Sequence, residues 1–208
     1  MSAAPEEEVR QLVRDALDRA LGAPTPAARS ATPAPGAPPA APERRVAIGA
    51  DHGGYPLKQL LIRALEDELA LQVVDCGTHS TDAVDYPDFA AAVGREVASG
   101  RCARGIVIDG AGIGSSMAAN KIAGVRCALC HDDRTALNAR EHNDANVLAL
   151  GAGIVNRGLA TRIARLFLTT PFGGGRHERR VQKIMALESA LRADQRPGGA
   201  PAGRGGGA

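Results

Sequence analysis

The chain has 208 residues, 44% hydrophobic and 23% charged, the proportions of a globular protein long enough to bury a core. Aromatic residues make up only 2% and the formal net charge is +2, which argues against nucleic-acid binding through stacked bases or a basic stripe. No run approaches the roughly 20 apolar residues that span a bilayer, and the acidic N-terminus is unlike a secretory signal, so we expect a cytoplasmic protein without a membrane partner.

Residues 5–22 predict an amphipathic helix, which we assign to a first segment, 1–22. Glutamates stand at its start, where the helix dipole favours them, and Gly22 stands where a C-cap is expected. Residues 23–44 are rich in Ala, Pro, Thr and Ser, which is typical of a disordered linker. The first helix is therefore expected to be tethered to the rest of the chain. Its apolar stripe comprises Val9, Leu12, Val13, Ala16, Leu17, Ala20 and Leu21.

Residues 45–192 alternate between strand and helix patterns, which predicts an α/β domain with a doubly wound parallel sheet flanked by helices. Ligands of such folds bind beyond the carboxyl ends of the strands. The Gly- and Pro-rich residues 193–208 predict a disordered tail. Strands are expected at 46–50, 71–76, 104–109, 125–130 and 147–150, and helices at 55–70, 89–99, 115–122, 135–141, 159–168 and 178–191.

The first strand of this domain ends in Asp51-His52-Gly53-Gly54. A carboxylate and an imidazole at a strand's carboxyl end could hold a polyol or a phosphate. Alternatively, Asp51 only caps the helix that follows.

The third strand runs into a glycine-rich turn, residues 110–114, that opens a helix. Such a turn presents backbone N–H groups to a phosphate or to a developing enediolate. It lacks both the dinucleotide-binding and the P-loop spacing, so no nucleotide cofactor is expected. Asp109, at the end of the apolar strand, could act as a general base.

Two later motifs carry further candidate side chains. His142 and Asn143 precede the last strand, and His142 could shuttle a proton or merely satisfy backbone groups in a turn. Arg176 and Arg180 fall on one helical face and could clamp a phosphate, or form a solvated charge run.

Cys127 and Cys130 have C-x-x-C spacing but lie in an apolar run, 125–130, that predicts a buried strand. No second such pair completes a zinc site, so no metal is expected.

Taken in order, five motifs resemble those of the ribose-5-phosphate isomerase B and galactose-6-phosphate isomerase family. They are Asp-His-Gly-Gly at 51–54, Asp-Tyr-Pro at 85–87, the glycine turn leading into Ala-Ala-Asn-Lys, His-Asn-Asp-Ala-Asn at 142–146, and Gly-Gly-Arg-His-x-x-Arg at 174–180. The resemblance covers about residues 45–192. It implies a Rossmann-like homodimer or tetramer with each active site between two subunits. The implied reaction is aldose–ketose isomerisation of a sugar phosphate, foremost ribose 5-phosphate to ribulose 5-phosphate, without metal or redox cofactor.

The resemblance also implies a role for each candidate residue. His142 would open the sugar ring. The phosphate would be met by Asp51, His52, Arg176 and Arg180, the sugar site lined by Tyr86 and Asn143, and the enediolate oxygens held by Gly110, Ala111, Gly112 and Gly114.

The chain departs from the family pattern in the glycine turn and after the fifth strand. Asp109 stands where many members carry a catalytic Cys, and Ala111 where Thr is usual. A glutamate that some relatives use is Ser115 here, and Gly153 replaces an arginine that commonly contacts phosphate. Asp109 is therefore the expected base. The alternative is a catalytically silent or substrate-altered sugar-phosphate-binding paralogue.

The first helix and its linker resemble the encapsulation peptides that direct cargo into bacterial microcompartments. The resemblance implies that residues 5–22 bind shell or cargo proteins and that the enzyme lies inside a microcompartment. A helix of this length is marginal in water and becomes ordered when its stripe finds a partner. The alternatives are that this helix binds a membrane surface or docks on its own domain. Membrane binding is disfavoured, because the polar face of the helix carries charges of both signs and the helix has no aromatic anchors.

Overall fold

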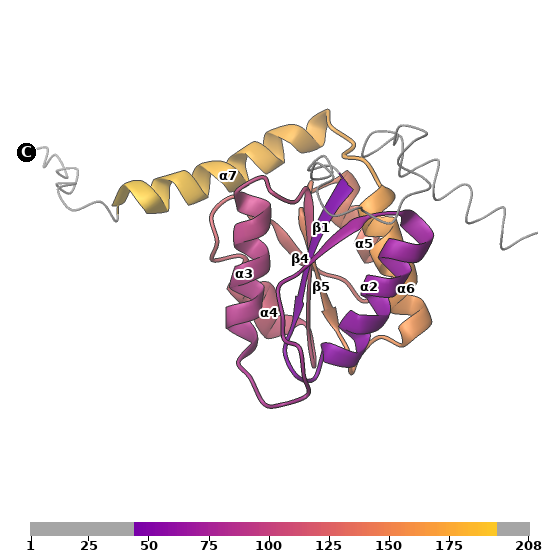
Figure 1. The fold of residues 1–208 in the computed structure, drawn as a ribbon. Coiled ribbons are helices and arrows are strands. Elements are labelled where there is room, and N and C mark those ends of the chain that lie inside the picture. Colours follow the sequence, from indigo (N-terminus) through magenta and orange to yellow (C-terminus); the bar gives the residue numbers. More distant parts are fainter. Residues whose placement is uncertain (1–43, 195–208) are drawn as a thin grey trace, which may run out of the picture.

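The computed structural model describes residues 44–194, which form a five-stranded parallel sheet with helices on both faces (Figure 1). This confirms the predicted Rossmann-like α/β fold. The predicted helix over 5–22, the linker up to residue 43 and the tail beyond residue 194 lie outside the described residues. The strands are β1 (Arg45–Ala50), β2 (Gln72–Asp75), β3 (Arg104–Asp109), β4 (Cys127–Leu129) and β5 (Val147–Gly151), in the spatial order β2-β1-β3-β5-β4.

The helices form two layers and one projecting arm. Helices α3 (Tyr86–Ala98) and α4 (Ile113–Ala119) cover one face of the sheet. The other face is covered by α2 (Tyr55–Leu69), α5 (Asp133–Glu141) and α6 (Arg157–Thr169). The last helix, α7 (Arg176–Asp194), extends away from the body, as the yellow end of Figure 1 shows.

Strands β1, β3 and β5 bury both of their faces, as parallel strands between two helical layers must. Alternate residues therefore enter two separate apolar cores. Gly105 lets α3 approach the sheet closely, since a Cβ at this position would lie 2.6 Å from Val93 Cγ1. The core under α2, α5 and α6 includes Ile48, Ile106 and Leu148, and the core under α3 and α4 includes Ala47, Val107 and Ala149.

Most predicted elements are confirmed within a few residues, and the differences have local causes. Helix α3 begins at Tyr86 rather than at residue 89, because Pro87 occupies its first turn, where a missing N–H costs no hydrogen bond. Helix α7 continues to Asp194, two residues into the predicted tail.

The predicted buried strand over 125–130 is wrong in extent and burial. Strand β4 covers only Cys127–Leu129, pairs with β5 alone and leaves its residues half-buried at the sheet edge. Asn120 covers part of that edge, because its side chain accepts the Cys127 N–H at 2.8 Å and donates to the Cys127 carbonyl at 2.9 Å.

Burial raises the pKa of the Cys127 thiol to about 12 and that of Cys130 to about 11, so both stay protonated near neutral pH. Within residues 44–194 no cluster of three His, Cys, Asp or Glu side chains is arranged to hold a metal ion. No helix in the same range is long and apolar enough to cross a membrane.

Candidate active site

The carboxyl ends of β1 and β3 bring the Asp51 motif and the glycine turn together. The two strands pair in register up to Ala50 and Ile108, and the Asp51 N–H donates to the Ile108 carbonyl at 3.1 Å. A Cβ on Gly53 would lie 3.9 Å from the backbone nitrogen of Gly110. The two motifs therefore form one surface, as predicted for the carboxyl edge of a doubly wound sheet.

Asp51 is buried and closes the turn that precedes α2. Its Oδ1 accepts the Gly54 N–H at 2.8 Å, and Gly54 is itself the N-cap residue. Asp51 therefore accepts no hydrogen bond from an N–H inside the helix, so helix capping does not fully explain why an aspartate occupies this position. His52 is exposed, and its Nδ1 lies 3.3 Å from both the backbone N and the backbone O of Val84. This contact leaves Nε2 of His52 available to a ligand.

Asp109 organises the glycine turn through three backbone hydrogen bonds. Its Oδ1 accepts the N–H groups of Ala111 and Gly112, and its Oδ2 accepts the Ser115 N–H at 2.8 Å. The carboxylate is buried, and Oδ2 keeps one further acceptor position. The N–H groups of Ala111 and Gly112, expected to face a substrate, are engaged by Asp109 instead.

Other donors of the turn remain available. In the part of the chain that the structure describes, no group accepts a hydrogen bond from the N–H of Gly110, Ile113 or Gly114. Tyr86 packs directly on this segment: a Cβ on Gly114 would lie 2.5 Å from Tyr86 Cζ and 2.8 Å from its hydroxyl. Only glycine permits this approach, so Gly114 places the phenol beside the turn. The Gly153 N–H donates to the Gly110 carbonyl at 2.9 Å, so Gly153 also lies beside the glycine turn.

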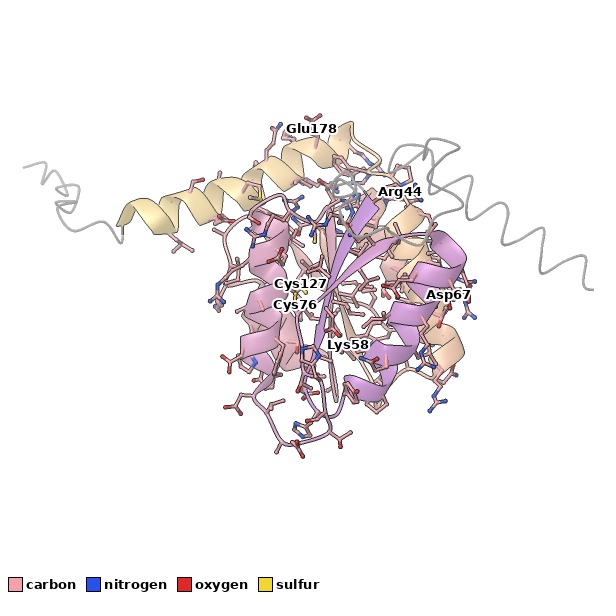
Figure 2. All side chains as sticks on the ribbon, viewed as in Figure 1. Arg44, Lys58, Asp67, Cys76, Cys127 and Glu178 are labelled. Atoms are coloured by element: carbon pink, nitrogen blue, oxygen red, sulfur yellow. The ribbon has the colours of Figure 1, made fainter. Side chains whose placement is uncertain are left out.

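The loop between β2 and α3, which carries Val84 to the ring of His52, is anchored by an ion pair between a buried lysine and an exposed aspartate. Lys58, labelled in Figure 2, has no exposed side-chain surface, and its Nζ lies 2.5 Å from Asp75 Oδ1. The same oxygen accepts the Gly77 N–H at 2.9 Å, which fixes the first turn of the loop. The sequence does not indicate this pair, because lysine is usually a surface residue.

The remaining candidates lie at the opposite, amino edge of the sheet. The loop that follows α5 packs on the start of β3, where the Gly105 N–H donates to the Asn146 carbonyl at 2.9 Å. His142 ends α5, and its ring stacks on His177 of α7, with 4.1 Å between centroids and 3° between planes. Figure 1 shows the start of α7 and the loop before α3 at opposite ends of the domain.

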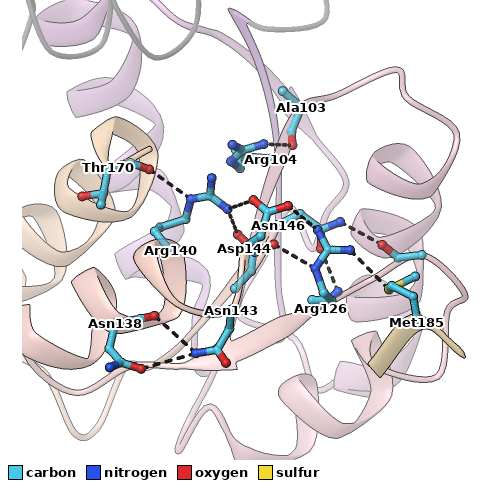
Figure 3. Close-up of polar contacts among 12 residues, drawn as sticks. Ala103, Arg104, Arg126, Asn138, Arg140, Asn143, Asp144, Asn146, Thr170 and Met185 are labelled. Atoms are coloured by element: carbon cyan, nitrogen blue, oxygen red, sulfur yellow. Dashed lines mark hydrogen bonds and ion pairs between the residues drawn. The ribbon is translucent and has the colours of Figure 1, made fainter. Parts of the chain in front are cut away.

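A network of two arginines and one carboxylate shapes the 142–146 loop (Figure 3). Asp144 has a left-handed backbone with φ 45° and lies 2.9 Å from Arg126 and 2.8 Å from Arg140. The Arg140 side chain is 1% exposed, and it also donates to the carbonyls of Ala145 and Thr170. Burial lowers the pKa of Arg140, and Asp144 offsets part of this cost. The network holds His142 and Asn143 in place.

Positive charge gathers around the two stacked imidazoles. Partial burial, and then the neighbouring His142, Arg176 and Arg180, lower the pKa of His177. Arg176 Nε lies 3.4 Å from His177 Nε2. Arg176 and Arg180 are exposed, so an anionic substrate can reach this cluster. A hollow of about 520 Å³ adjoins it, lined by residues that include Arg126, Arg134, Asn138, Asn143 and Ile184.

We name the two groups by their position. The carboxyl-edge half-site comprises Asp51, His52, Tyr86, Asp109 and the glycine turn, and the amino-edge half-site comprises His142, Asn143, Arg176 and Arg180. The sheet separates them, so the described part of one chain does not bring Asp109 and His142 together.

Comparison with known proteins identifies what this arrangement resembles. The family model described as Ribose/Galactose Isomerase matches residues 46–184. Over 145 residues the chain is 42% identical to the ribose-5-phosphate isomerase B of Escherichia coli, covering 70% of this chain and 97% of that protein.

Solved structures agree. The structure of Clostridium thermocellum ribose-5-phosphate isomerase B has a TM-score of 0.69 and 48% identity, covering 71% of this chain and 99% of that one. The type B ribose 5-phosphate isomerase of Trypanosoma brucei has a TM-score of 0.67 and 46% identity, covering 69% and 98%.

The Arg126–Asp144–Arg140 network gives a stability prediction. Asp144→Asn keeps a side chain that tolerates the left-handed backbone but leaves the buried Arg140 without its carboxylate, and it should lower the free energy of unfolding by roughly 3 kcal/mol in urea titrations. Asp133→Asn is the control, because it removes an exposed ion pair with Arg162 and should cost about 1 kcal/mol or less. Equal losses in the two variants would contradict this account.

Proposed function

The chain belongs to the ribose/galactose isomerase family and is a sugar-phosphate isomerase, and we propose that it interconverts ribose 5-phosphate and ribulose 5-phosphate. The relatives named above support this substrate. The observation that carries the proposal is the division of chemistry between the half-sites. A carboxylate beside available N–H donors occupies one edge, and imidazoles with guanidinium groups occupy the other.

In the proposed reaction, His142 gives the proton on Nε2 to the ring oxygen, and the proton of the C1 hydroxyl passes through water back to Nε2, which opens the ring to the aldehyde and leaves the imidazole neutral. Oδ2 of Asp109 then takes the proton from C2 through its remaining acceptor position. The electrons of the broken C–H bond form the C1–C2 double bond, and the aldehyde oxygen becomes the enediolate oxygen. Return of the proton to C1 and loss of the C2 hydroxyl proton, with protonation of the C1 oxygen, give the ketose.

Two further interactions would stabilise this path. The N–H groups of Gly110, Ile113 and Gly114 are placed to donate to the enediolate oxygens, and donors fixed before charge develops are the effective ones. Arg176 and Arg180 would bind the phosphate, together with His52 of the facing half-site.

We infer that the active enzyme is a homodimer. The half-sites lie at opposite edges of one sheet, so a two-fold axis that joins the amino edge of one subunit to the carboxyl edge of its partner completes two sites at once. Apolar side chains near both half-sites support this association, because large exposed apolar groups commonly mark interfaces. They are Tyr86, Ile113, Met117 and Ile154 around the glycine turn, and Ile184, Leu187 and Leu191 on α7.

We also propose, from the sequence of residues 5–22, that this segment directs the enzyme into a bacterial microcompartment by binding shell or cargo proteins. The support is an apolar stripe on a helix-forming segment, joined to the enzyme by a linker rich in Pro and Ala.

Mixing two inactive variants tests the shared site. His52→Ala removes a carboxyl-edge group and His142→Ala removes an amino-edge group, and each alone should lower kcat/KM at least tenfold. Refolding them together should restore about one quarter of wild-type activity, because half of the dimers are mixed and each mixed dimer has one intact site. His142→Ala mixed with Arg176→Ala is the control, since both changes lie in the same half-site and should not complement. Absence of recovery in the first mixture would argue against a site shared between subunits.

Asp109→Asn tests the proposed base. Asparagine keeps an oxygen for Ala111 and Gly112 but cannot take a proton, so kcat should fall by about a hundredfold or more. Protection of the variant against heat by ribose 5-phosphate should persist, because the phosphate contacts remain.

Asp132→Asn is the matched control for loss of a capping carboxylate. Asp132 accepts the Thr135 N–H at 2.7 Å at the start of α5, and because asparagine caps a helix about as well as aspartate, its substitution should change both thermal stability and kcat little. Full activity of Asp109→Asn would reject Asp109 as the base. If the wild-type protein does not isomerise ribose 5-phosphate but is still protected by it against heat, the result would favour a sugar-phosphate-binding paralogue.

Deletion of residues 1–22 tests the targeting proposal. The shortened enzyme should keep its kcat/KM but no longer sediment with microcompartment shells when both are produced in one cell. Leu12→Glu with Leu17→Glu should have the same effect at full length, because it interrupts the apolar stripe. Unchanged shell association in both variants would refute the proposal.

A further inference from the structure

Asn138 connects the two proposed site residues that end α5, and Figure 3 shows its contacts with Asn143. It lies one helical turn before His142, and its Nδ2 is 2.8 Å from His142 Nδ1. The Asn143 Nδ2 lies 3.3 Å from both the backbone carbonyl oxygen and the side-chain Oδ1 of Asn138. The three side chains form one hydrogen-bonded chain.

The backbone carbonyl fixes the direction of every bond in this chain. A carbonyl oxygen can only accept, so the Asn143 group facing it must be the amide nitrogen. The same nitrogen donates to the side chain of Asn138, which therefore turns Oδ1 toward Asn143 and Nδ2 toward His142. Because Nδ2 can only donate, His142 Nδ1 accepts, and the proton of the neutral ring is on Nε2.

We propose that Asn138 is a positioning residue that sets the tautomer of His142. This inference rests on the proposed function, in which Nε2 of His142 protonates the ring oxygen of the sugar. By donating to Nδ1, Asn138 keeps a proton on Nε2 while the ring is neutral, so the imidazole can act as an acid without first becoming an imidazolium.

The surroundings of the ring support this role. His177 of α7 stacks on it, and the charged neighbours of His177 are Arg176 and Arg180 of the same helix and Glu141 of α5. Within residues 44–194 no carboxylate pairs with His142, so the amide of Asn138 is the group that selects the tautomer.

Helix stability does not explain Asn138. The residue is exposed, and asparagine is a poorer helix former than leucine at an interior position. Asn138→Leu should therefore keep or raise the melting temperature. A change in catalysis in this variant would reflect the lost hydrogen bonds.

Asn138→Asp is the most specific test, because it replaces only the amide nitrogen that donates to His142 by an oxygen. The aspartate keeps an oxygen for Asn143 but must accept from Nδ1–H of His142, which leaves Nε2 of the neutral ring without a proton. We expect kcat on ribose 5-phosphate at pH 8 to fall at least tenfold and to recover as the pH is lowered toward 6, where the imidazolium again carries a proton on Nε2. The wild-type enzyme should not gain activity over that range. Asn156→Asp is the control for added charge, since it keeps the oxygen that caps α6, and its pH profile should match the wild type.

Nitrogen NMR of the histidine rings in the full chain gives a readout that does not need activity. In the wild type, the His142 signals, identified by their loss in His142→Gln, should show protonated Nε2 and unprotonated Nδ1, and Asn138→Asp should reverse them. Parallel pH profiles for the wild type and Asn138→Asp, or an Nδ1-protonated wild-type ring, would overturn the inference. Full activity of His142→Ala would instead refute the proposed ring-opening role of His142, so the two failures are distinguishable.

Discussion

The common direction of the five strands decides where every candidate residue lies. Groups that follow a strand, such as Asp51 after β1 and the glycine turn after β3, come to the carboxyl edge. Groups that precede a strand, such as His142 and Asn143 before β5, come to the amino edge. A single parallel sheet cannot bring the two sets together, because the full length of the strands lies between its carboxyl and amino edges. The division of the proposed active site between two subunits follows from this constraint.

Buried charges fix the loops on which the site is built. Lys58 with Asp75 anchors the loop that carries Val84 to the ring of His52, and Arg140 with Asp144 anchors the loop that carries His142. Each pair also bonds backbone groups near its loop, so removing the carboxylate would leave a buried cation without its partner and disturb the backbone. Stability and placement of the site thus depend on the same contacts.

Carboxylates and amides hold backbone groups as well as doing the proposed chemistry. Asp109 accepts three N–H bonds, which defines the glycine turn and selects which N–H groups stay available to a substrate. Asn138 and Asn143 use one backbone carbonyl to orient two amides and, through them, an imidazole. In both cases a group that can only donate or only accept fixes the direction of its neighbours' hydrogen bonds.

The sequence by itself determined the α/β class, nearly all element positions and the candidate residues, because strand and helix periodicities and strand-end motifs are local properties of the chain. It did not determine that β4 is a half-buried edge strand, since strand order depends on pairing with β5. Nor did it show that Lys58 is buried, that Asp109 engages Ala111 and Gly112, or that Asn138 meets His142, although the spacing of four residues between the last two was a usable sign. Only the tertiary structure decided which candidates share an edge of the sheet, because that depends on how distant segments pack, which no local pattern encodes.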